Sequence, residues 1–179
     1  MNIFFLHKDP NTCAKYYSDK HVGKIILEIT QLLACAQYFN HDDELPYKNC
    51  YKKTHINHPL SKWVRESYNN YLYALRIGFC LCKEFKHRRN KTHACKFHLK
   101  KLKKIKRFDG FEVDWGDKVR LDIARNDIYD ITPIPMCMPD TCIKYDCAVK
   151  CYREYYQTEK KDINVWNWGR DKPKWYKPN

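Results

Sequence analysis

The chain has 179 residues, which is enough for one domain with a hydrophobic core and too few for two full domains. Apolar residues make up 44% and only five positions are glycine, so general disorder is excluded although 31% of the residues are charged. The formal charge of +13 favours polyanionic partners, nucleic acid above all; the alternative is the lysine-rich composition typical of an AT-rich genome.

The N-terminal residues 3–6 form a short apolar run that fits either a strand or a buried extended segment. No basic leader or small-residue cleavage site accompanies this run, so it is not typical of a signal peptide. No apolar stretch approaches the roughly 20 residues that span a bilayer. We therefore expect an intracellular protein without a membrane partner.

A long N-terminal helix is expected next. Asp9-Pro10 is typical of a helix start, with the aspartate as cap and the proline in the first turn. Apolar residues then follow helical spacing to about Phe39, beside a polar stripe. The apolar residues are Val22, Ile25, Ile26, Ile29, Leu32, Leu33 and Ala36, and the polar stripe is His21, Lys24, Glu28 and Gln31.

The middle of the chain predicts a loop and two further helices. Residues 41–54 lack apolar periodicity and indicate a loop, after which His58-Pro59 begins an aromatic helix expected to reach about Arg88. A basic helix is expected from about Thr92 to Lys106.

The C-terminal part begins with an acidic insertion at about 109–130, in which residues 111–115 alternate like one arm of a hairpin. A proline-containing irregular segment follows, then a helix expected from Tyr145 to Tyr156 and an aromatic tail that should pack against the body. The prediction is a mainly α, compact single domain over residues 1–179, with a long N-terminal helix, a short N-terminal extended segment and a small hairpin insertion.

The ten cysteines favour free thiols in a reducing compartment. The closest grouping is at positions 137, 142, 147 and 151, and it lacks the paired C-x2-C knuckles of structural zinc sites. The sequence therefore indicates neither a metal nor a cofactor.

The region from Lys86 to Arg107 contains eleven lysines and arginines and no acidic residue. Such a run can contact nucleic-acid phosphates along a groove, although exposed helices covered with lysines are common. The candidates for phosphate contact here are Lys91, His93, Lys100 and Lys104.

The polar stripe of the first helix offers a pair for proton transfer. His21 and Glu28 lie two turns apart on one face, and the nearby Lys20 and Lys24 could shift their pKa values or bind phosphate. A solvated helix edge is the alternative interpretation.

The entrance of the second helix offers an anion site. His55, Asn57 and His58 lie where free backbone N–H groups and the helix dipole favour a phosphate, and Arg65 follows within two turns. In the tail, Trp175 could stack on an extruded base, or it could be a core residue.

These motifs resemble, over nearly the whole chain, a family of small phage and large-virus proteins of uncertain function. That resemblance implies a location in the host cytoplasm or nucleus, or in the virion. The residues that carry it are DKHVGKIILE at 19–28, THINHPLSKWVRES at 54–67, KTH at 91–93, MPD at 138–140, AVKCYREYY at 148–156 and PKWY at 173–176.

The N-terminal third is also similar, more distantly, to the pyrimidine-dimer DNA glycosylases of the endonuclease V type. Asp19, His21 and Glu28 match that family's Asp-x-His motif and its glutamate seven residues later, and Trp175-Tyr176 parallels its C-terminal aromatic pair. The resemblance implies an all-helical fold in which Glu28 manages proton transfer at the sugar and the N-terminal α-amine attacks C1′ to form a Schiff base.

Two positions depart from that family. Its processed N-terminus carries a small residue followed by arginine, whereas this chain begins Met1-Asn2, and its arginine beside the glutamate is Leu27 here. Either the amine of Met1 serves, or the lyase step is lost and another base-directed activity remains.

The resulting hypothesis is a DNA-binding base-excision enzyme, a glycosylase with or without strand scission, acting on damaged or modified pyrimidines. Two alternatives remain open: a viral enzyme that acts on a free nucleotide or modified base, and a non-enzymatic basic DNA-binding or virion protein.

Overall fold

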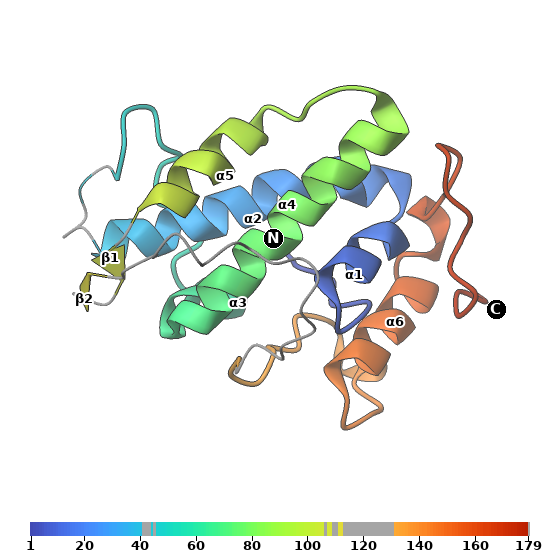
Figure 1. Ribbon diagram of the computed structural model, residues 1–179. Helices are drawn as coiled ribbons and strands as arrows, with labels where there is room; N and C mark the ends of the chain where they lie inside the picture. The colour runs from blue at the N-terminus through green and yellow to red at the C-terminus, as the bar shows by residue number, and fades with distance from the viewer. Residues whose placement is uncertain (41–43, 45, 106, 109–110, 113–130, 179) are drawn as a thin grey trace.

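The computed structural model describes residues 1–40, 44, 46–105, 107–108, 111–112 and 131–178, and the fold is mainly helical, as the sequence predicts (Figure 1). A short antiparallel pair of strands after α5 joins Arg107 to Glu112 and Phe108 to Phe111. The elements are α1 (Pro10–Tyr16), α2 (Asp19–Asn40), α3 (Pro59–Glu66), α4 (Tyr68–Arg89), α5 (Cys95–Lys104), β1 (Arg107–Phe108), β2 (Phe111–Glu112), the 3-10 turns η1 (Asp140–Cys142) and η2 (Lys161–Ile163), and α6 (Ala148–Thr158).

The two long helices α2 and α4 pack against each other at the centre of the molecule (Figure 1). Helix α5 lies along α2, α1 and α3 contact α4, and α6 stands on the side of the C-terminus. A core cluster draws on all six helices, the N-terminal segment and the tail. None of the helices in the described ranges is long and apolar enough to cross a bilayer.

The N-terminal residues 3–6 are a buried extended segment and not a strand. Ile3, Phe5 and Leu6 are 0% exposed. Phe4 is tied by its backbone, because its N–H donates to the Tyr17 hydroxyl (2.8 Å) and its carbonyl accepts from that hydroxyl (2.9 Å). This burial fixes where the first residues of the chain lie.

The expected long N-terminal helix is two helices, so the prediction of one was wrong. Tyr17 adopts an extended backbone (φ −62°, ψ 139°) that ends α1. The carbonyl of Tyr17 accepts from Arg88, and that of Ser18 accepts from the backbone N–H groups of His21 and Val22, which starts α2. Contacts distant in sequence thus override the continuous apolar pattern.

The second expected helix is also divided, at Ser67. This residue is extended (φ −147°, ψ 153°), and its hydroxyl accepts from the Asn70 backbone N–H at 3.1 Å as the N-cap of α4. The Asn70 side chain donates to the carbonyl of Trp63 at 2.8 Å, which satisfies an end of α3. A serine inside the apolar pattern was the signal for this break.

The other boundaries shift by a few residues. Asn90 ends α4 in the left-handed conformation (φ 52°), and α5 begins at Cys95, whose N–H donates to the His93 ring. The proline segment at 133–139 is irregular, as expected, and the tail packs on the core through Tyr176. The expected hairpin arm is seen only as Phe111–Glu112, because residues 113–130, most of the acidic insertion, lie outside the described residues.

A buried ion network fixes the ends of α1, α2 and α4. The Arg88 side chain is 1% exposed and donates to Asp19 and to Glu84, both at 2.8 Å. It also donates to the carbonyls of Tyr17 (2.9 Å) and Lys15 (3.1 Å). Every side of the guanidinium therefore meets an acceptor, as a buried charge requires.

We expect Arg88→Met to lower the free energy of unfolding by about 3–5 kcal/mol, because it leaves the buried Asp19 carboxylate without its cation and removes one of the two cations that pair with Glu84. Urea unfolding followed by circular dichroism measures this loss. The control Lys83→Met, at an exposed position of α4, should change stability by about 0.5 kcal/mol or less. Equal losses in the two variants would contradict a special role for Arg88.

Candidate functional site

Glu28 lies at the edge of the exposed face of α2, where the N-terminal segment crosses the helix. Its side chain is 13% exposed, and its Oε2 accepts from the Asn2 backbone N–H at 2.6 Å. The Lys24 ammonium, one turn earlier, lies 3.8 Å from Oε1. The carboxylate is therefore held against the first residues of the chain while it keeps contact with solvent.

The position of Asn2 is fixed from a second side. Its side-chain Nδ2 donates to the Cys137 carbonyl at 2.9 Å, and Cys137 belongs to the proline segment after the acidic insertion. Burial raises the pKa of the Cys137 thiol, and the Met1 ammonium is close enough to act in the opposite direction. The chain start, α2 and the proline segment thus meet at one point.

His58 brings the entrance of α3 to the same point. It is the N-cap of α3, and its Nδ1 accepts from the Leu60 N–H at 3.2 Å. Partial burial lowers the pKa of His58, the Met1 ammonium lowers it further, and Glu28 acts to raise it. Of the predicted residues, His58 therefore lies within electrostatic reach of both the Met1 ammonium and Glu28.

The loop before α3 is braced by Arg65. Its guanidinium donates to the Ile56 carbonyl at 2.7 Å and lies 4.5 Å from the centre of the Phe39 ring. His55 has a positive φ of 49° and contacts the Thr54 hydroxyl at 2.7 Å. The side chains of His55 and Asn57 are exposed, so this loop can meet a ligand that approaches Glu28.

His21 has a different environment from Glu28, although both belong to α2. It is 4% exposed, and its Nδ1 lies 2.7 Å from the Tyr156 hydroxyl and 3.0 Å from that of Ser18. Burial, reinforced by Lys160, Lys24 and Lys20, lowers the pKa of His21 to about 4. The imidazole is therefore neutral at pH 7 and packed into the core.

The cationic candidates remain on the surface. Lys20 and Lys24 are exposed on α2, and Lys91, Lys100 and Lys104 are exposed before and along α5, which runs beside α2 (Figure 1). These lysines are available for contact with a polyanion.

Two aromatic candidates are occupied within the protein. The His93 ring lies edge-on to Phe85 at 5.0 Å, and partial burial lowers its pKa. The Trp175 indole packs against Tyr16 and Tyr156, with the Arg153 guanidinium 5.0 Å from its ring centre. Trp175 accordingly stabilises the attachment of the tail.

Sequence reasoning missed the contributions of Asn2, Cys137 and Arg88. None of them shares a periodic pattern with Glu28, and Cys137 is 109 positions away from it in the chain. The buried Arg88 was counted within a basic run, from which its burial could not be inferred.

Among the described residues, no group of three or more histidine, cysteine or acidic side chains is placed to hold a metal ion. No family model, curated protein or solved structure matches the chain. Function is therefore inferred from the chemistry of the residues around Glu28.

The buried His21 predicts a pH dependence of stability. In the unfolded chain it binds a proton below about pH 6.5, whereas in the folded protein it does so only near pH 4. The stability that the neutral His21 contributes is fully present above pH 6.5, and it is lost as the pH falls from there through 4. Between pH 7 and pH 4 we expect the stability difference between wild type and His21→Gln to shrink by about 3 kcal/mol, measured by urea unfolding.

The exposed Lys83 provides the control for this measurement, because a lysine carries the same charge at pH 7 and at pH 4. The difference between wild type and Lys83→Gln should stay constant over the same pH range. A constant difference for His21→Gln as well would show that its imidazole is not buried in its neutral form.

Proposed function

We propose that the protein is a DNA base-excision enzyme, a glycosylase that acts on damaged or modified pyrimidines. One observation carries this proposal: the Glu28 carboxylate lies 2.6 Å from the backbone nitrogen of residue 2, one residue from the terminal amine, and His58 is within electrostatic reach of both Glu28 and that amine. A carboxylate beside an amine is the pair that amine-based glycosidic cleavage requires.

In the proposed reaction, the neutral amine attacks C1′ of the deoxyribose. The bond from C1′ to the base breaks, and its electron pair leaves with the base, which takes up a proton. The amine then loses a proton as the sugar ring opens to a Schiff base. Glu28 would accept protons from the amine and return one to the ring oxygen, and hydrolysis would release an abasic site. Loss of a C2′ proton would instead expel the 3′ phosphate.

The nucleophile can be the amine of Met1 or, after removal of Met1, that of Asn2. The Asn2 nitrogen already donates to Glu28, so processing would create an amine in contact with the carboxylate. An asparagine at position 2 disfavours removal of Met1. If Met1 is retained, its amine is one residue away from the nitrogen that donates to Glu28.

The surface around Glu28 supports a DNA substrate. Lys24 and Lys20 precede it on the exposed face of α2, the loop with His55 and Asn57 borders it, and helix α5, which carries the exposed Lys100 and Lys104, packs against α2. Arg65 holds the loop in place through the Ile56 carbonyl, and the exposed side chains of His55 and Asn57 would contact the DNA. Positive charge on this face matches the phosphates on either side of an extruded nucleotide.

We expect Glu28→Gln to lower base release about 100- to 10,000-fold, because it removes the proton acceptor but keeps the shape. Release of free base from a panel of ultraviolet-damaged and modified-pyrimidine duplexes measures this effect, and fluorescence anisotropy should show nearly unchanged DNA binding. The control Glu159→Gln, at an exposed position after α6, should behave as wild type. An unaltered rate in Glu28→Gln would remove this residue from the mechanism.

We also expect borohydride to trap a covalent complex with abasic and damaged duplexes, because it reduces a Schiff base to a stable amine. The denaturing-gel band should disappear when a Gly-Ser extension moves the amine away from Glu28, with unchanged DNA affinity. Mass spectrometry of the trapped peptide shows whether Met1 or Asn2 is linked. A band that persists with the extended chain would assign the nucleophile to a lysine.

A further inference from the structure

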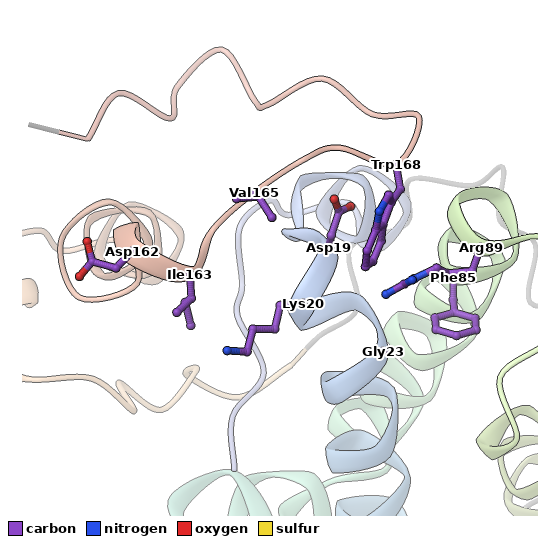
Figure 2. A pocket seen from close by; sticks show the side chains of 9 residues that line it. All are labelled: Asp19, Lys20, Gly23, Phe85, Arg89, Asp162, Ile163, Val165 and Trp168. Carbon is purple, nitrogen blue, oxygen red and sulfur yellow. The ribbon is translucent and has the colours of Figure 1, made fainter.

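A recess lies at the end of the exposed face of α2 that is away from Glu28. It has a volume of about 510 Å³, a size typical of small-molecule sites, between the start of α2, the end of α4 and the segment that follows η2 (Figure 2). The residues that line it are Asp19, Lys20, Gly23, Phe85, Arg89, Asp162, Ile163, Val165 and Trp168.

The charge of this recess favours an anion. Asp19 is already compensated, because its two oxygens accept from Arg88 at 2.8 Å and from the Asn167 N–H at 2.6 Å. Lys20 and Arg89 are both exposed: the Arg89 guanidinium reaches toward α2 beside Trp168, and Lys20 extends from α2 toward the side of Ile163 and Asp162 (Figure 2). The first turn of α2 adds the positive end of a helix dipole.

The walls near Arg89 offer flat surfaces to an aromatic ring. The Arg89 guanidinium lies over the Trp168 indole, and Phe85 lies below it (Figure 2). Gly23 has no side chain, so the α2 wall is open at this position. A Cβ there would lie 3.3 Å from the Phe85 ring. Indole rings and guanidinium planes are the groups on which nucleobases stack.

We propose that this recess binds one nucleotide, with its phosphate on Lys20 and Arg89 and its base against Trp168. Binding in this recess does not depend on the activity assigned to Glu28. Lys20 and Glu28 are eight residues apart on one helix, a rise of about 12 Å, which corresponds to about three or four nucleotides along one strand of B-form DNA. The nucleotide can therefore be free or can belong to the strand that reaches Glu28.

The test is isothermal titration calorimetry with thymidine 5′-monophosphate, thymidine and inorganic phosphate. Wild type should bind the monophosphate more tightly than either fragment. Arg89→Gln and Lys20→Gln should each weaken it about 10-fold, and Trp168→Ala should do so to a similar extent. The control Lys62→Gln, an exposed lysine of α3, should bind as wild type, and circular dichroism should show all variants folded.

A short oligothymidylate distinguishes the two sources of the nucleotide. Binding much tighter than that of the monophosphate, with the same sensitivity to Arg89→Gln, assigns the recess to a strand; equal affinities assign it to a free nucleotide. Equal affinity of wild type and the three recess variants for both probes, or no binding of either probe, overturns the proposal. Glu28→Gln should not alter monophosphate affinity, so failure of base excision and failure of this proposal are separate results.

Discussion

The buried guanidinium of Arg88 is the constraint on which the arrangement of this protein depends. It joins the end of α1, the start of α2 and the last turns of α4, and its partner Glu84 also accepts from Arg170 of the tail at 2.7 Å. Because α2 begins where Asp19 meets this cation, the register of α2 is set there. That register decides which residues of α2 face solvent, and so where Lys20, Lys24 and Glu28 stand. A buried ionic network of this kind adds little net stability compared with an apolar core. It favours one arrangement of the helices, because other arrangements would leave buried charges unpaired.

The two acidic residues of α2, Asp19 and Glu28, differ in their surroundings. Asp19 has both oxygens engaged by a buried arginine and a backbone N–H, so its charge is committed to structure. Glu28 meets one backbone N–H and an ammonium that is 64% exposed at 3.8 Å, a weak pair in water. Burial likewise separates His21, which is held neutral in the core, from His58, which borders the chain start. Spacing along a helix places such groups on one face, but only their neighbours decide which of them can exchange protons with a ligand.

Much of the fold could be predicted from the sequence because the apolar periodicity of α2, α4, α5 and α6 is local information. The break at Tyr17 was missed because a group distant in sequence, Arg88, stabilises it. The break at Ser67 was missed although its signal is local, a serine cap and the nearby Asn70, because the aromatic pattern continues across it. For the site, the helix pattern and motif similarity pointed to Glu28, whereas its contact with Asn2 depends on a buried N-terminal segment whose path no local pattern encodes. The packing of Trp175 against Tyr16 and Tyr156 could not be predicted for the same reason, because it depends on the assembled core.

The two proposed sites lie on one face of α2, in the part of the helix that precedes the buried residues 32–38. This part runs from Lys20 to Gln31 and includes the exposed side chains of Lys20 and Lys24. Lysines stand at one end of this part and midway along it, and the carboxylate of Glu28 lies near the other end. A nucleic-acid strand that lies along α2 would therefore contact the lysines before it reaches the carboxylate of Glu28. Its phosphates would neutralise the positive charge of Lys20 and Lys24. Under the two proposals above, binding and chemistry would be arranged in series on one rigid helix, which would fix the distance between them.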